Sequence, residues 1–167
     1  MAYNHRNYSV PLIPRSETSG VKSSTTFPQF HVYSSGNQTI TATDAKLSFN
    51  TFVYDSGDLW STSNNRFTAP VRGIYSFGWI VTCQIQQSQL YNAVYPRLNG
   101  AGTRYRSRIQ SYGMTGGGWA SFGGGGIMDI SEGDYVELWG YCFGSGNTIT
   151  CQAGETSFWG HLHGPHT

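Results

Sequence analysis

The chain has 167 residues, of which 38% are hydrophobic, 15% aromatic and only 11% charged, and its formal net charge is +1. This length fits one domain with or without a short arm, and the hydrophobic content is enough for a core without a disulfide or metal staple. Abundant glycine and aromatic residues exclude a helical bundle and favour short strands, while the small net charge argues against non-specific binding to nucleic acid. Because soluble domains typically carry about 25% charged residues, we expect part of the surface to be hidden in an assembly.

Residues 1–27 differ from the rest of the chain and predict an extended N-terminal arm. Pro11 and Pro14 enclose a short apolar segment, and a polar stretch follows it. We expect the arm to be laid on a partner and anchored by its apolar side chains, Val10, Leu12 and Ile13; the alternative is a frayed tail. The arm lacks the apolar run of a signal peptide, so we expect a protein made in the cytoplasm and not secreted. No stretch of the chain predicts a membrane span.

Residues 28–167 predict a single all-β domain. Short runs of β-branched and aromatic residues alternate with clusters of Gly, Asn and Ser, which is typical of strands joined by turns. Helical periodicity and internal repeats are absent from the sequence. The predicted strands, in chain order, are residues 29–33, 45–54, 66–68, 73–83, 93–98, 103–111, 119–130, 135–141 and 156–163.

The strand expected over residues 73–81 carries the strongest physical signal. It has aromatic rings at positions 75, 77 and 79 and isoleucines at 74 and 80, so that both of its faces are apolar. A strand with one solvated face would alternate between apolar and polar residues. We therefore expect one face to pack on the core and the other on a second body, for which another copy of the chain is the economical candidate.

Eight residues match a sequence signature in which aromatic, acidic or amide, and bulky apolar residues are separated by fixed numbers of positions. The signature ends in glycine, tyrosine, phenylalanine and a further ring at alternate positions. They are Phe49, Asp55, Trp60, Phe67, Gly73, Tyr75, Phe77 and Trp79. The pattern resembles that of the globular head of complement C1q and its relatives in the tumour-necrosis-factor jelly-roll superfamily; Trp79 is the one departure, since phenylalanine or tyrosine is usual there. Residues 127–138 resemble the family's late strand pair around a Gly-Asp turn, and residues 157–162 resemble its closing strand.

The resemblance implies a ten-stranded antiparallel jelly-roll sandwich of the C1q/TNF-like type. It also implies a homotrimer in which one sheet packs around a threefold axis. The large rings would then be divided between the core and the trimer interface, and alternation alone does not say which ring goes where. These residues are Phe49, Trp60, Phe67, Tyr75, Phe77, Trp79, Phe122, Phe158 and Trp159.

The chain departs from secreted relatives, which carry a signal peptide and usually a collagen or coiled-coil stalk. A small trimer with an anchoring arm resembles the add-on proteins of tailed-phage particles. We therefore expect a head decoration or cement protein on the capsid surface, bridging capsid subunits through contacts of the arm with the major capsid protein or another virion subunit. The alternatives are a receptor-binding tip of a tail or head fibre, with a host glycan as partner, and a stand-alone C1q-like ligand-binding module.

Four of the eight arginines gather in one stretch of sequence. Arg104, Arg106 and Arg108 alternate along a predicted strand, and Arg97 lies nearby. Guanidinium groups bind carboxylates with paired hydrogen bonds, so these residues are candidates for binding a partner. The alternative is a solvated outer strand whose charge prevents edge pairing. No second basic stripe accompanies them, which argues against nucleic acid.

The histidines and cysteines do not predict a metal site or another cofactor. His161 and His163 share a strand face and His166 follows, but no acidic or thiol partner stands at a fixed spacing. The three cysteines also lack metal-ligand spacing and are expected to be free thiols. A two-residue turn after position 145 would instead place Cys142 opposite Cys151, where a disulfide is sterically allowed.

Catalysis is not expected from this sequence. The glycine runs 116–118 and 123–126 lack the Lys-Ser/Thr of a phosphate-binding loop, and they favour close backbone approach or a bulge. Neither a nucleophile elbow nor a Cys-His arrangement is present, and the acidic residues are scattered. The sequence therefore predicts a binding or structural protein.

Overall fold

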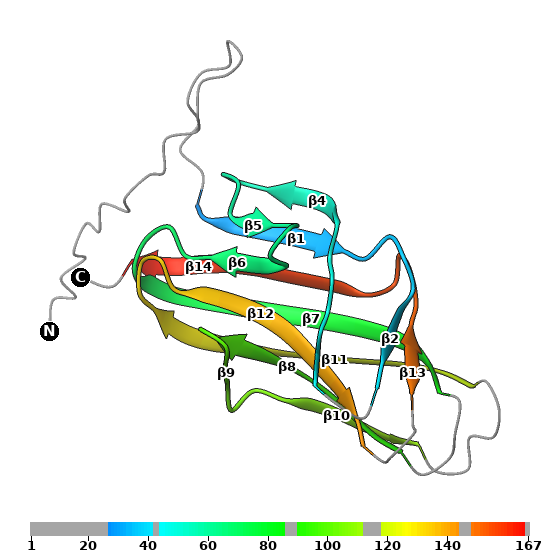
Figure 1. Ribbon diagram of the computed structural model, residues 1–167. Coiled ribbons are helices and arrows are strands. Elements are labelled where there is room, and N and C mark those ends of the chain that lie inside the picture. The colour runs from blue at the N-terminus through cyan, green and yellow to red at the C-terminus, as the bar shows by residue number, and fades with distance from the viewer. Residues whose placement is uncertain (1–26, 42–43, 86–89, 112–117, 144–147, 166–167) are drawn as a thin grey trace, which may run out of the picture.

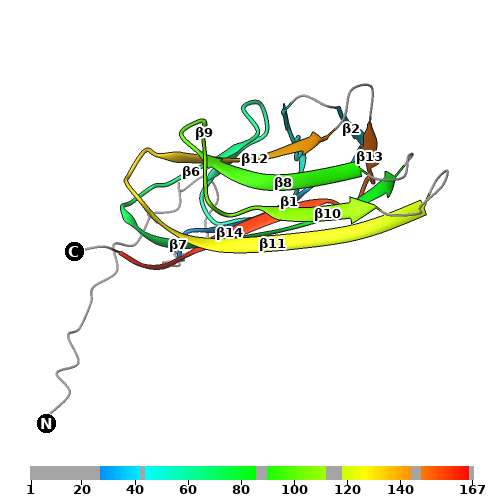
Figure 2. The ribbon, with the colours of Figure 1, turned by 90° about the horizontal axis from the view of Figure 1, so that it is seen from below.

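A computed structural model describes residues 27–41, 44–85, 90–111, 118–143 and 148–165. Within these ranges every regular element is a strand, and two antiparallel sheets pack face to face (Figures 1 and 2). The predicted all-β antiparallel sandwich is confirmed. Among the described residues, no helix has the length and apolar character needed to cross a membrane. The arm residues Val10, Leu12 and Ile13 lie outside the described residues, and so does His166.

The first sheet is built around the long strand β7, which runs from Gly73 to Ile85. β11 (Gly118–Ile130) pairs with one edge of β7 along its whole length. Two strands share the other edge, β14 (Ser157–Pro165) and β13 (Ile149–Cys151). Beyond them the sheet continues with β1 (Gln29–Tyr33), β4 (Thr51–Asp55) and β2 (Gln38–Ile40).

The second sheet is centred on β8 and β12, which lie across the core from β7. Its strands run in the order β10 (Ser107–Ser111), β8 (Leu90–Leu98), β12 (Tyr135–Cys142), β6 (Arg66–Thr68) and β5 (Trp60–Ser61). Two short segments complete it, β3 (Ala45–Lys46) on β12 and β9 (Ala101–Gly102) on β8. In Figure 2 the edge strands β10 and β11 run side by side along one side of the sandwich.

The described residues form fourteen strand segments, so the expected count of ten is not confirmed. The predicted strand over residues 45–54 is wrong, because the chain crosses between sheets there. Leu47 still donates its backbone N–H to the Leu138 carbonyl of the second sheet, at 2.9 Å. The N–H of Phe49 instead bonds to the side chain of Asn65, and Thr51 already pairs with Tyr33 in the first sheet.

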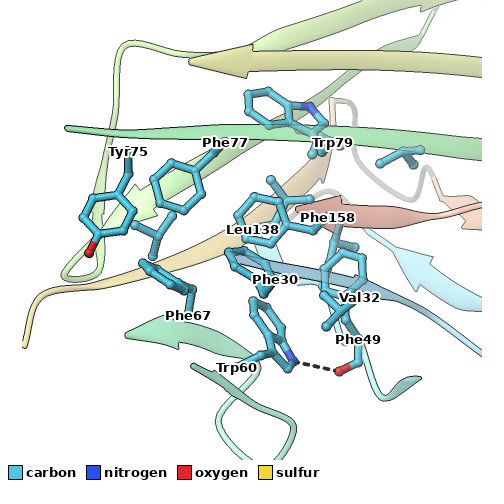
Figure 3. Packing of buried hydrophobic residues seen from close by; sticks show 14 of the residues in the cluster. Phe30, Val32, Phe49, Trp60, Phe67, Tyr75, Phe77, Trp79, Leu138 and Phe158 are labelled. Carbon is cyan, nitrogen blue, oxygen red and sulfur yellow. Dashed lines mark hydrogen bonds between the residues drawn. The ribbon is translucent and has the colours of Figure 1, made fainter. Parts of the chain in front are cut away.

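A continuous layer of aromatic rings fills the space between the sheets. Phe30 stacks on Trp60 and Phe67 with ring centroids 5.4 and 5.0 Å apart, and its ring meets Phe158 edge-on at 5.2 Å (Figure 3). The indole N–H of Trp60 donates to the Phe49 carbonyl at 3.0 Å, so this buried polar group is satisfied. Stacked and edge-on ring pairs add to the free energy gained by burying apolar area.

The glycine run in β11 makes room for rings of the same chain. A Cβ at Gly124 would stand 2.5 Å from the Trp79 ring, and a Cβ at Gly126 would stand 2.4 Å from the Tyr105 ring. These rings close the side of the sandwich, because the Trp79 indole donates to Ser107 at 2.7 Å and the Tyr105 hydroxyl donates to the Ile127 carbonyl. The predicted close approach at glycines 123–126 is therefore confirmed, although residues 116 and 117 lie outside the described part.

The three cysteines are free and buried, and the suggested pairing of Cys142 with Cys151 is wrong. β12 and β13 belong to different sheets, so the two strands are not the arms of one hairpin. Cys142 is opposite Asn92 on β8, while Cys151 is opposite Cys83 on β7. Burial raises the pKa of the Cys83 and Cys151 thiols to about 12 and that of Cys142 to about 11, which leaves all three weakly reactive.

Candidate interaction surfaces

The outer face of the first sheet exposes large apolar side chains along β7 and its neighbour β11. Along β7 the rings of Tyr75, Phe77 and Trp79 point into the core, so the alternate, even-numbered residues point outward. Among these, Ile80 is 42% exposed. On the neighbouring strand β11, Trp119 and Ile127 are also outward and are 52% and 55% exposed. We call this surface the apolar face.

A row of aromatic side chains crosses the apolar face from β14 to β4. Trp159, His31 and Tyr54 are register partners on adjacent strands. The His31 ring meets Trp159 and Tyr54 edge-on, at centroid distances of 5.7 and 5.9 Å. The Trp159 indole extends over Gly78 of β7, where a Cβ would lie 2.5 Å from the ring. Burial lowers the pKa of His31.

Two further histidines lie beside this row on β14. The rings of His161 and His163 are 4.8 Å apart, and the Nε2 atom of His163 hydrogen-bonds to the Ser76 hydroxyl of β7. Burial, and then the proximity of His163, lower the pKa of His161. Within the described part of the chain, no group of three His, Cys, Asp or Glu side chains has the geometry of a metal site.

The outer face of the second sheet carries arginines stacked on aromatic rings. The Arg97 guanidinium lies 4.0 Å above the centroid of Trp139, and that of Arg106 lies 4.5 Å above the centroid of Tyr95. Arg106 also lies 5.7 Å from the centroid of Tyr141, which meets Tyr95 edge-on. We call this surface, comprising these residues and Arg108, the arginine face.

Two acidic groups on the arginine face already have partners. Arg97 forms an ion pair with Asp44 and donates to the Tyr95 hydroxyl at 3.3 Å. Glu137 accepts from the Trp139 indole at 2.9 Å and from the Lys46 ammonium at 3.1 Å. Arg106 and Arg108 are exposed, and no ion pair among the described residues involves either of them.

The structure resolves where the predicted rings lie. Phe49, Trp60, Phe67, Tyr75, Phe77, Trp79 and Phe158 are buried in the core, and Phe122 packs partly buried against it. Trp159 alone among the predicted rings lies on the apolar face. Among the arginines, Arg97 and Arg106 join the arginine face through ring contacts and Arg108 through its register with Ala93. Arg104 is exposed like Arg106 and Arg108, and like Arg106 it precedes β10; its place in a binding site stays a prediction.

Sequence reasoning missed several residues of both faces. On the apolar face these are Trp119, Ile127, His31 and Tyr54, and under the arginines they are Tyr95, Trp139 and Tyr141. Trp119 and Ile127 could have been found from the alternation of residues 119–130, because both stand at odd-numbered positions, like the other exposed residues of β11. The rings below the arginines become visible only when β8, β10 and β12 are known to be neighbours.

Comparison with solved structures identifies proteins with a similar fold. The globular domain of zebrafish complement 1qA superposes with a TM-score of 0.61 over 84% of this chain and 100% of that chain, at 16% identity. The Eiger TNF protein from S. frugiperda superposes with a TM-score of 0.64 over 84% of this chain and 95% of that one, at 10% identity. The chain has the C1q/TNF-like jelly-roll fold. At these identities the likeness concerns the fold and leaves function open.

Sequence comparison finds a relative whose name assigns it no function. No family model matches the chain. The protein named "Uncharacterized protein YqcC" from Bacillus subtilis (strain 168) is 31% identical over 107 residues, which are 62% of this chain and 29% of that protein. The chain therefore spans less than a third of the length of this relative.

Proposed function

We propose that the protein is the subunit of a homotrimer that acts as a structural, non-catalytic protein of a tailed-phage particle. The observation that carries the first part is the apolar face. Burying exposed side chains such as Ile80, Ile127 and Trp119 against further copies would gain free energy in proportion to the apolar area removed from water. A patch of this kind on the sheet of a sandwich needs a cover from outside the fold.

The oligomeric state tests this part directly. At micromolar concentration, we expect sedimentation equilibrium to give three times the chain mass of 18.4 kDa. Ile80→Arg should shift the mass toward one chain, because it places a charge in the middle of the buried face. The matched control is Phe143→Arg, which adds the same charge at a 63% exposed residue that follows β12 of the other sheet. A wild-type protein that sediments as one chain would refute the trimer.

The role on a phage particle is supported by the predicted arm and by the low charge. An apolar segment between two prolines is suited to lie extended in a groove of a shell subunit. Only 11% of the residues are charged, which fits a protein whose surface is partly hidden in an assembly. Three arms on one trimer would bind with a high effective local concentration, even if each arm alone bound weakly. We therefore propose a decoration or cement protein on the capsid surface, with the major capsid protein or another virion subunit as partner.

The rival function is a binding module, either at a fibre tip or free of any particle. The match to YqcC favours it, since that protein carries the matched sequence in less than a third of its length, as expected for a module of a larger chain. Copy number distinguishes the two. Hundreds of copies over the head, counted by imaging of intact particles, would indicate a decoration protein, whereas a few copies at the tail would indicate a receptor-binding tip.

A further inference from the structure

We propose that the arginine face is a binding site for an extended acidic segment of a protein partner, held through the carboxylates of alternate residues. This site lies on the sheet opposite the apolar face, so it stands independently of the proposed trimer. The residues that would contact the ligand are Arg106 and Arg108, with Tyr95 and Tyr141 beneath them.

The first argument is the orientation of the Arg106 side chain. Its guanidinium plane is supported from below by the Tyr95 ring at 4.5 Å, and Tyr141 flanks it at 5.7 Å. Tyr95 is only 3% exposed, so the ring is fixed in the sheet. A guanidinium stacked on a fixed ring keeps its edge N–H groups for paired hydrogen bonds to a carboxylate and loses less side-chain entropy on binding.

The second argument is the local charge. Among the described residues, Asp44 is paired with Arg97, and Glu137 bonds to Lys46 and Trp139, so these two carboxylates are already engaged. Arg106 and Arg108 therefore leave positive charge at this edge of the second sheet. β10 is an edge strand of the second sheet, but the Trp79 indole of β7 bonds to Ser107 at its start and the Tyr105 hydroxyl bonds to the Ile127 carbonyl of β11, so contacts with the first sheet already cover part of this edge.

The third argument is the spacing of the two arginines. Arg106 directly precedes β10 and Arg108 lies within it, and the two share the outer face because Arg106 lies over Tyr95 and Arg108 is opposite Ala93. Alternate residues of a strand are roughly 6.8 Å apart. Carboxylates at alternate positions of an extended acidic peptide repeat at the same distance.

The faces of the nearby rings are covered by guanidinium groups, which leaves less room for a sugar to stack and favours a peptide.

The experiment measures binding of a fluorescent peptide with alternating Glu and Thr by anisotropy, using the full-length protein. A peptide with alternating Gln and Thr is the control probe. We expect the Glu peptide to bind more tightly, and Arg106→Gln to weaken that binding about tenfold, as the loss of one bidentate charge-assisted contact would. Arg72→Gln is the matched variant, since it removes an exposed arginine that instead pairs with Asp129 on the first sheet. It should bind like the wild type.

Substitution by lysine separates geometry from charge. Arg106→Lys keeps the charge but loses the planar fork, and we expect it to bind nearly as weakly as Arg106→Gln. Because Arg106 is exposed, the thermal unfolding midpoint should confirm that both variants remain folded. Equal binding of the two peptides, full binding by Arg106→Lys, or an equal loss in Arg72→Gln would each overturn the proposal. So would competition by inorganic phosphate or by an oligogalacturonate at lower concentrations than the Glu peptide requires.

Discussion

Asp55 shows how one side chain of the family-like signature acts on the fold. Its carboxylate accepts hydrogen bonds from the backbone N–H groups of Leu59 at 3.0 Å and Trp60 at 2.9 Å, and a longer one from Gly57 at 3.3 Å. It thereby organises the turn between β4 and β5 and holds Trp60 over the core. The sequence located Asp55 by its spacing, but its bonding role depends on the folded turn.

Replacing this carboxylate should destabilise the protein. We expect Asp55→Ala to lower the free energy of unfolding by about 1–3 kcal/mol, because partly buried N–H groups lose their acceptor. Asp55→Asn keeps one acceptor oxygen and should lose less. Urea unfolding followed by tryptophan fluorescence measures both, and Glu132→Ala, at an exposed carboxylate, should change stability by less than about 0.5 kcal/mol. An Asp55→Ala variant as stable as Glu132→Ala would contradict this account.

At the scale of single residues, the sequence predicted which aromatic residues matter to the fold better than it predicted whether each ring lies in the core or on an outer face. Spacing identified the rings of the signature, because they recur at gaps that the jelly roll requires. It could not assign Trp159 to the outer face, since this depends on the register that β14 adopts against β7. The partners of the cysteines were also hidden, because Cys151 meets Cys83 only through pairing of strands far apart in sequence.

At the scale of strands, the histidines of β1 and β14 should make stability depend on pH. The pKa of His31 and of His161 is lowered below the ordinary value of 6.5 in the folded protein. The unfolded chain then takes up protons more readily, so these residues contribute full stability above about pH 6.5 and lose that contribution as the pH falls below it. On the same face, the carboxylate of Asp129 pairs with Arg72.

We therefore expect the free energy of unfolding to decrease between pH 7.5 and pH 5. A His31→Gln, His161→Gln double variant should show a smaller decrease than the wild type over the same interval, because the groups that take up the protons are gone. Urea titrations at several pH values measure the difference. Stability that rises on acidification, or an unchanged slope in the double variant, would show that these histidines do not control the response.

Most of the strands were predicted where hydrophobic alternation is long, and the three-residue β6 is an exception. The expected strands at residues 29–33 and 66–68 coincide with β1 and β6, and β7, β11, β12 and β14 differ from expectation by one or two residues at their ends. The short strands β2, β5, β9 and β13 were missed. Segments of two or three residues carry too little periodicity, and they become strands only because a neighbouring strand accepts their hydrogen bonds.

At the scale of the whole molecule, the predicted arm and the sandwich should be separable. The core is complete from Phe30 onward, so removal of residues 1–20 should leave the thermal unfolding midpoint and the oligomeric mass unchanged. Under the proposed decoration role, the same deletion should abolish attachment to particles. Pelleting of purified heads with either protein measures attachment. A truncated chain that coats heads as tightly as the full chain would refute the anchoring role of the arm.

The ring layer between the sheets keeps the two outer faces chemically separate. Trp79 and Phe158 occupy the space between them, and neither reaches the solvent. A substitution that alters the cationic side can therefore accumulate without disturbing the hydrophobic side, and the reverse also holds. Under the two proposals made above, self-association and binding of a foreign chain would depend on separate faces, so that a designer would be able to change either specificity while retaining the other.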